Sequence, residues 1–341
     1  MRVLLIGGNG FIGRPLTRQL TEAGHEVAIF HRSAEHSPVL PAAQIHGDRN
    51  RLADYETEIR QFAPQVIVDM VLSSGPQAEA SAAFAAKLQA RLVAVSSMDV
   101  YRAWGVMHGT EPGDLEPLPI TEDSALRRSG RTYPPEVVEK MKPIFTWLNE
   151  AYDKVEVERA MMGVAGNTVI RLPMVYGPGD RLHRMYGILK RIADGRPAII
   201  MAENYAAWRG PRGYVENVAH AIALAATSRQ AAGRTYQVCD EPTLTELEWQ
   251  KKIAAHAGWG GRFVTLPREK TPKHLMMPGN TAQQVVASSQ RIRSELGYKE
   301  VVEPGEALRR TILWEQANPP EEQSFHQFDY EAEDSALQEC V

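Results

Sequence analysis

The sequence has few of the features that mark secreted, metal-binding or membrane-spanning proteins. Cysteine occurs only twice in 341 residues, as Cys239 and Cys340, which excludes a disulfide framework and a cluster of metal-ligating thiolates. No uninterrupted apolar run reaches the roughly 20 residues of a membrane span. The run at residues 3–6 is also too short for the core of a signal peptide. We therefore expect a cytoplasmic protein that binds no metal and has no membrane partner.

A large excess of one charge is also missing. The chain carries 38 Lys and Arg against 42 Asp and Glu, a net charge of −4, so no nucleic-acid partner is expected. Residues 321–341 contain seven acids and no Lys or Arg. We predict that residues 319–341 form an acidic tail. We expect this tail to be poorly ordered, because such a composition rarely offsets the entropy cost of ordering. Phe325, Phe328 and Tyr330 are its candidate anchors to the body of the protein.

What the chain does contain is an alternation of apolar runs with amphipathic segments. The runs at 3–6, 26–31, 65–70 and 91–96 are continuous, which is typical of strands buried on both faces. Helix-like segments separate them. The pattern predicts an α/β fold with a doubly wound parallel sheet.

This regularity breaks after Tyr101. Residues 102–143 hold six of the 22 prolines, so we expect an insertion or lid without long regular elements. A strong helix is expected from about residue 144 to residue 162. A strand at 168–172 should follow it.

A glycine-rich segment follows the first predicted strand. Gly8 to Gly13 fits G-x-G-x-x-G, and Gly7 extends it to the wider G-x-x-G-x-x-G spacing. Glycines at these positions permit a tight turn and let the backbone approach a pyrophosphate at the start of a helix. The alternative is an incidental glycine-rich turn. The predicted cofactor-binding residues here are Gly7, Gly10, Phe11, Ile12 and Gly13.

The end of the second predicted strand indicates which dinucleotide binds. An acid there would accept hydrogen bonds from a ribose 2′-hydroxyl, but this sequence has Arg32 and Ser33, which suit a 2′-phosphate. We therefore predict NADP, with NAD possible if Arg32 is only a solvated surface residue. Asp48 is a candidate for binding the adenine amino group, or it caps a local turn.

Five segments of the sequence, the glycine-rich one included, form a pattern whose order and spacing are specific to one protein family. The segments are 7–13, 95–101, 171–179, 212–218 and 294–298. In this order they resemble the extended short-chain dehydrogenase/reductase family of NAD-dependent epimerases and dehydratases, over the chain to about residue 318. The resemblance implies a Rossmann domain at 1–175 that includes the insertion, and a smaller C-terminal domain, mainly substrate-binding, at 176–318. It also implies a homodimer.

The resemblance also implies a catalytic set. The family uses a Tyr and a Lys four residues apart on a helix, with a Ser or Thr; Lys154 and Ser97 fit two of these positions. Glu150 stands at the tyrosine position. Tyr152 is excluded, because two residues along a helix turn a side chain by about 200°, toward the opposite face. The chain is thus an atypical member that has lost tyrosine-dependent redox chemistry, or one in which Glu150 is the candidate acid or base. Alternatively, Glu150 and Lys154 form an ordinary helix ion pair.

Further candidates follow from the same alignment. Asp99 stands where sugar dehydratases of the family carry a carboxylate, and Pro173 resembles the proline behind the nicotinamide ring. Tyr176, Trp208 and Arg212 are candidate substrate-binding residues, Arg212 as an anchor for phosphate or carboxylate or as a surface ion pair.

Three functions remain open. The first is an NAD(P)-dependent oxidoreductase or epimerase-like enzyme acting on a hydroxyl or carbonyl of a sugar-like or small polar metabolite. The second is a redox-neutral eliminase or isomerase that uses Glu150 or Asp99. The third is a non-catalytic dinucleotide-binding or RNA-associated protein.

Overall fold

The fold is that of a computed structural model, which describes residues 1–32, 41–130, 133, 135–145, 148, 151–321 and 326–339. Seven strands of the described chain form one parallel sheet in the order β10-β6-β5-β4-β1-β2-β3. Its strands are β1 (Arg2–Ile6), β2 (Glu26–His31), β3 (Ala43–His46), β4 (Val66–Asp69), β5 (Arg91–Ser97), β6 (Thr168–Leu172) and β10 (Thr235–Gln237). The predicted doubly wound sheet is confirmed, and its order reverses at β1, between β2 and β4.

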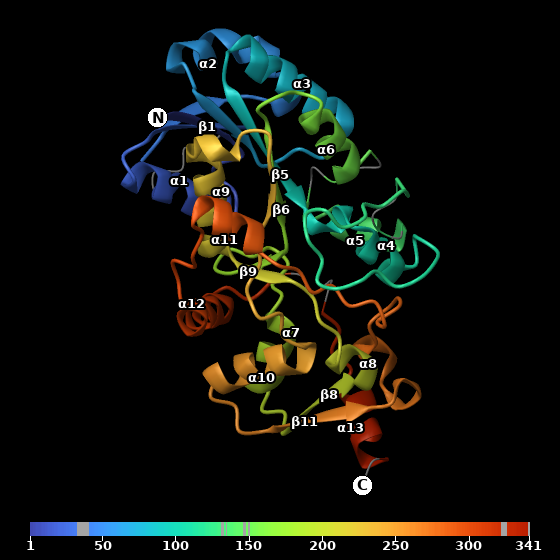
Figure 1. Cartoon of the computed structure of the whole chain (residues 1–341). Helices are drawn as coiled ribbons and strands as arrows, with labels where there is room; N and C mark the ends of the chain where they lie inside the picture. The colour runs from blue at the N-terminus through green and yellow to red at the C-terminus, as the bar shows by residue number, and fades with distance from the viewer. Residues whose placement is uncertain are drawn as a thin grey trace.

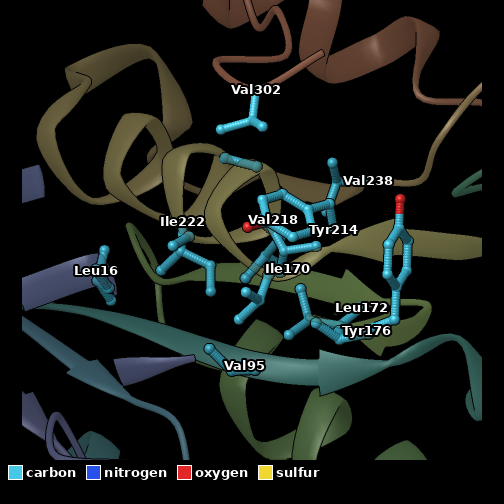
Figure 2. Packing of buried hydrophobic residues seen from close by; sticks show 14 of the residues in the cluster. Leu16, Val95, Ile170, Leu172, Tyr176, Tyr214, Val218, Ile222, Val238 and Val302 are labelled. Carbon is cyan, nitrogen blue, oxygen red and sulfur yellow. The ribbon is translucent and has the colours of Figure 1, made fainter. Parts of the chain in front are cut away.

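Successive residues of β1 point to opposite faces of this sheet. Val3 and Leu5 pack into one buried cluster, whereas Leu4 and Ile6 pack into another. Each cluster is covered by helices, so both faces of a strand must be apolar and the strand reads as a continuous run. Figure 2 shows the first cluster, where side chains of one helix lie over β5 and β6.

Two helical layers sandwich the sheet. On one face α1 packs against α9, and on the other α3 packs against α6. The helices of the described residues are α1 (Gly13–Glu22), α2 (Glu56–Phe62), α3 (Gly75–Lys87), α4 (Arg102–His108), α5 (Pro135–Met141), α6 (Lys154–Met162), α7 (Tyr186–Ala193), α8 (Glu203–Ala206), α9 (Val215–Thr227), α10 (Glu246–His256), α11 (Gln290–Leu296), α12 (Pro304–Ala317) and α13 (Tyr330–Gln338). None of these helices combines the length and the apolar character that a membrane span needs.

The far end of the molecule holds smaller elements. Two short parallel pairs form there, β8 (Ala198–Ala202) with β11 (Arg262–Leu266), and β7 (Met174–Tyr176) with β9 (Arg212–Tyr214). In Figure 1 α7, α8 and α10 lie around β8 and β11, away from the central sheet. Between β9 and β11 the chain returns to the central sheet, because α9 packs on that sheet and β10 is one of its strands.

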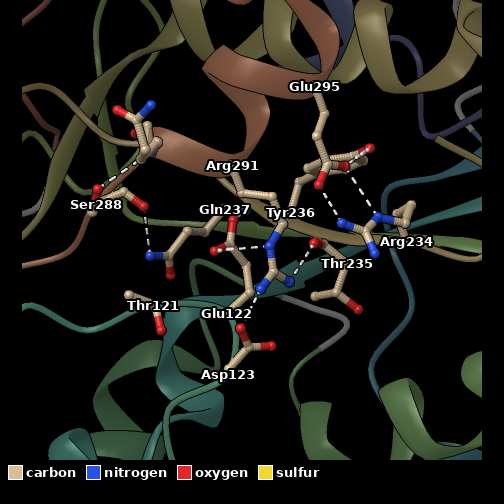
Figure 3. A network of polar contacts seen from close by, with 12 residues as sticks. Thr121, Glu122, Asp123, Arg234, Thr235, Tyr236, Gln237, Ser288, Arg291 and Glu295 are labelled. Atoms are coloured by element: carbon tan, nitrogen blue, oxygen red, sulfur yellow. Dashed lines mark hydrogen bonds and ion pairs between the residues drawn. The ribbon is translucent and has the colours of Figure 1, made fainter. Parts of the chain in front are cut away.

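A polar network ties the proline-rich insertion to the body (Figure 3). The backbone N–H of Gln237 donates to the Glu122 carboxylate at 3.0 Å, and the Gln237 amide donates to the Ser288 carbonyl at 2.8 Å. Arg291 lies 3.6 Å from Glu122. The insertion contains only the short helices α4 and α5 among its described residues, as its prolines led us to expect.

Two expectations about local structure were wrong or incomplete. The helix expected from residue 144 begins only at Lys154, where the Asp153 side chain accepts from the Val155 N–H at 2.9 Å and caps it. The acidic tail is ordered in part, because α13 packs its Glu333 side chain to 1% exposure. Phe325 lies outside the described residues.

Candidate active site

The glycine-rich turn leaves no space for side chains. Gly7 has φ +86°, and a Cβ on Gly13 would meet the Gly7 carbonyl oxygen at 2.5 Å. The Gly10 N–H donates to Gly7 at 3.1 Å and closes the turn. Helix α1 then starts without an acidic residue in its first turn and without a side-chain cap, so its N–H groups suit a phosphate. Phe11 and Ile12 are half-buried against the core. These residues fit a dinucleotide pyrophosphate.

Of the two residues predicted to select NADP over NAD, the structure describes only one. Arg32 directly follows β2 and is exposed, whereas Ser33 lies outside the described residues. The Asp48 carboxylate accepts from the Asn50 N–H at 2.9 Å and caps a short 3-10 helix, Arg49–Tyr55. Asp48 therefore caps a local turn, which is the second of the two functions considered for it in the sequence.

A cavity of about 780 Å³ opens at the carboxyl ends of β5 and β6. Parallel doubly wound sheets place ligands at this edge. The cavity brings together six of the predicted site residues, namely Ser97, Asp99, Lys154, Pro173, Trp208 and Arg212. Tyr176 is not among its described lining residues; it is buried and packs edge-on against Trp249, with ring centroids 5.0 Å apart.

Two tyrosines share one oxygen of Asp99. The Tyr152 and Tyr133 hydroxyls donate to Asp99 Oδ2 at 2.7 Å and 3.0 Å, and their rings stack with centroids 6.3 Å apart. Burial, and next the negative charge of Asp99, raise the pKa of both phenols well above its ordinary value. Both phenols are therefore protonated at neutral pH. Asp99 Oδ1 is buried and has no hydrogen-bond partner in the described chain.

Lys154 and Ser97 stand beside this group. The Lys154 ammonium donates to the carbonyls of Leu72 and, at 3.0 Å, of Val95, and burial lowers its pKa to about 8. The Ser97 hydroxyl accepts from the Asp99 N–H at 3.1 Å and caps the turn that carries Asp99.

Glu150, the predicted acid or base, lies outside the described residues. The argument that excluded Tyr152 was wrong, because it assumed a continuous helix through residue 152. Tyr152 precedes the Asp153 cap and is not helical, so its side chain reaches the cavity that Lys154 also lines.

Trp208 and Arg212 line the other side of the cavity. The Trp208 indole donates to the Gln283 carbonyl at 3.0 Å. Arg212 forms an ion pair with the buried Glu246, and its guanidinium lies 5.1 Å from the centre of the Trp249 ring. Pro173 follows β6 directly and also lines the cavity.

Sequence reasoning missed several lining residues. Trp104 and His108 come from α4, Tyr133 from the proline-rich insertion, Glu246 from α10 and His326 from the tail. No spacing in the sequence marks them, since tertiary packing alone brings these segments to the cavity. The sequence did point to Tyr152, because it lies two residues before Lys154. The assumption of a continuous helix led us to exclude it.

A doubly wound sheet, a glycine cradle at its switch point and a cavity with paired acid and phenol groups define a dinucleotide-binding enzyme. The chain belongs to the NAD dependent epimerase/dehydratase family, whose family model matches residues 3–239. It is thus an enzyme of the extended short-chain dehydrogenase/reductase type, as its motifs predicted.

Individual relatives are more distant. A 2-alkyl-3-oxoalkanoate reductase of Stenotrophomonas maltophilia (strain K279a) is 36% identical over 29% of this chain and 28% of its own length. A 3-diazoavenalumate denitrifying reductase of a Streptomyces species is 25% identical over 88% of this chain and 96% of its own. The structure of dTDP-glucose 4,6-dehydratase from Bacillus anthracis str. Ames, in complex with NAD, superimposes with a TM-score of 0.66 at 15% identity, over 95% of this chain and 99% of that one. At that identity the likeness shows the fold alone.

Proposed function

We propose that the chain is an NAD(P)-dependent oxidoreductase or epimerase-like enzyme acting on a hydroxyl or carbonyl group of a small molecule. The observation that supports this most is the 2.7 Å contact from the Tyr152 hydroxyl to Asp99 in a cavity that Ser97 and Lys154 also line. The name of one relative, 2-alkyl-3-oxoalkanoate reductase, supports the direction of carbonyl reduction.

The residues of the chain would divide the work as follows. Tyr152 is protonated; its O–H turns from Asp99 to the carbonyl oxygen and gives up its proton there as the hydride reaches the carbonyl carbon, which leaves a phenolate. The Lys154 charge offsets the repulsion between that phenolate and Asp99. Lys154 places a positive charge beside the cavity, and Ser97 holds the turn that carries Asp99. The bound nicotinamide supplies or accepts the hydride.

Redox-neutral proton transfer is a second candidate, favoured by one observation. Asp99 Oδ1 is buried without a partner in the described chain, so it can accept a proton from a carbon acid. Glu150, the other candidate base from the sequence, stays a prediction.

The finer cofactor and assembly assignments are also proposals. Arg32 at the end of β2 supports NADP over NAD, and Arg32→Ala should weaken NADPH binding about tenfold or more while leaving NADH unchanged. Equal weakening of both cofactors would refute the assignment. The homodimer implied by the family is tested by sedimentation of the full chain.

One assay separates the functions. The protein is incubated with NADPH or NADP⁺ and panels of ketones, secondary alcohols and nucleotide sugars, and both cofactor fluorescence and products are followed. Stoichiometric cofactor oxidation with an alcohol product supports the oxidoreductase. Product without net cofactor change supports redox-neutral catalysis, and binding without any product refutes both.

A further inference from the structure

One wall of the cavity is a continuous row of five aromatic rings. Trp208 meets Trp104 with centroids 6.0 Å apart, and Trp104 stacks on His108 at 5.6 Å. His108 meets Tyr133 at 5.5 Å, and Tyr133 stacks on Tyr152 at 6.3 Å. The row therefore links Trp208 to the tyrosines that donate to Asp99, and all five rings line the cavity. Aromatic faces of this kind bind flat apolar bodies.

The arginines of the cavity are already paired with carboxylates. Four cationic side chains line the cavity within the described chain, and Lys154, which donates to two backbone carbonyls, is the one among them that forms no ion pair with a carboxylate there. Each of the other three has a carboxylate partner. These pairs are Arg184 with Asp180 at 2.6 Å, Arg191 with Glu333 at 2.5 Å, and Arg212 with Glu246. A diphosphate or carboxylate would have to displace one of these partners, which leaves a buried carboxylate without compensation.

The wall nevertheless carries polar atoms that lack partners. Trp104 Nε1 and His108 Nε2 are buried and make no hydrogen bond in the described chain, although Trp104 is only 9% exposed. Burial lowers the pKa of His108, so its ring is neutral. Such atoms cost free energy unless a ligand or water satisfies them. Trp208 differs, because its indole N–H already donates to Gln283 at 3.0 Å.

We infer that the substrate is an uncharged, mainly apolar carbonyl compound with a flat ring, whose second oxygen binds Trp104 Nε1 and His108 Nε2 while its carbonyl faces Tyr152. This inference rests on the proposed function and names its substrate class. It departs from the sugar-like or small polar metabolite that the motifs favoured, because the Arg212 guanidinium expected to anchor a phosphate is paired with Glu246.

The test uses three ligands that differ at one position: benzylacetone, its para-hydroxy analogue and its para-carboxylate analogue. Their affinities for the full chain saturated with NADP⁺ are measured by calorimetry, so that no reduction takes place. The para-hydroxy ketone should bind about fivefold more tightly than benzylacetone, since it satisfies a buried donor. The carboxylate should bind at least about tenfold more weakly, because it loses its hydration in the cavity while all three lining arginines are already paired with carboxylates.

Variants locate the second-oxygen site. Trp104→Phe keeps an aromatic ring but removes the N–H, and should abolish the advantage of the para-hydroxy ketone over benzylacetone when both are measured on the same variant. His108→Phe is the second variant if the first does not fold. Trp259→Phe is the matched control, because the Trp259 indole donates to the Arg196 carbonyl at 2.9 Å and does not line this cavity.

Several outcomes would contradict the inferred substrate class. Tightest binding by the carboxylate, tighter binding of UDP-glucose than of any ketone, or no binding by all four ligands overturns the inference. Failure of the proposed function gives a different result: the neutral ketones bind, but the protein saturated with NADPH does not reduce them.

Discussion

At the scale of single residues, Asp99 and Tyr152 carry the proposed chemistry. The phenol lies 2.7 Å from a carboxylate and is fully protonated at neutral pH, so it holds the proton that the carbonyl oxygen has to receive. Burial and Asp99 also raise its pKa, so transfer of this proton depends on the Lys154 charge to stabilise the phenolate. Tyr133 donates to the same oxygen at 3.0 Å and stacks on Tyr152, which makes it the natural comparison.

Tyr152→Phe should therefore lower kcat about a hundredfold or more, while NADPH affinity changes less than about twofold. Tyr133→Phe leaves the proton donor in place and should have a clearly smaller effect. Steady-state kinetics and cofactor titration on both variants check this. A larger loss in Tyr133→Phe would assign the donor to Tyr133 instead.

Lys154 gives a prediction about stability. Its pKa in the folded protein is about 8, below the ordinary value of 10.5, so between these pH values the unfolded chain binds a proton that the folded chain does not. The free energy of unfolding of the wild type should consequently rise from pH 8 to 10.5 relative to Lys154→Met, by at least about 1 kcal/mol. Urea unfolding across this range measures the difference. Parallel pH profiles of the two proteins would mean that Lys154 is not buried in this way.

At the scale of elements, the start of α6 decides which residues reach the cavity. Asp153 caps the helix, accepting from the Val155 N–H at 2.9 Å, and lies 3.4 Å from Arg127. Tyr152, which lies directly before the cap, is not helical, and both Tyr152 and Lys154 line the same cavity.

Removal of this cap tests the arrangement. Asp153→Ala should lower the free energy of unfolding by about 1 kcal/mol and reduce kcat more than it raises KM, because both flanking residues lose their fixed position. Asp153→Asn retains a capping oxygen and should recover most of both losses. Unchanged kinetics in Asp153→Ala would show that the cap does not position the site.

The sheet could be predicted from the sequence because buried parallel strands leave a direct signature. The strand at 168–172 was predicted with the bounds it has, and the glycine turn was placed correctly between β1 and α1. The helix expected from residue 144 was extended too far, because the four-residue spacing from Glu150 to Lys154 does not mark the first residue of a helix. Trp104, His108 and Tyr133 could not be predicted, since irregular segments reach the cavity through packing alone.

At the scale of the whole molecule, the acidic tail is joined to the substrate side of the fold. Glu333 of α13 is buried and accepts from Arg191 at 2.5 Å and from His274 at 2.9 Å, and His326 lines the cavity. The composition of the tail indicated a poorly ordered segment, because composition alone does not show which basic residues elsewhere in the chain pair with its acids. Arg191 on α7 provides the partner that offsets the cost of burying Glu333.

The tail should be dispensable for the cofactor but not for stability. Deletion of residues 321–341 should leave NADPH affinity within about twofold and lower the free energy of unfolding by about 3–5 kcal/mol, because Arg191 then lacks its buried partner. Glu333→Gln should give a smaller loss of the same kind, with exposed Glu269→Gln as control. Loss of NADPH binding on deletion would contradict this account.

The central claim is that this chain transfers hydride to a carbonyl group with its own phenol as proton donor. A single turnover with NADPH deuterated at both C4 positions and the para-hydroxy analogue of benzylacetone tests it most directly, in wild type and in Tyr152→Phe. The account predicts an alcohol carrying one deuterium per NADP⁺ formed in the wild type, and a rate lower by about a hundredfold in the variant. Product without cofactor oxidation, or an equal rate in both proteins, would contradict it.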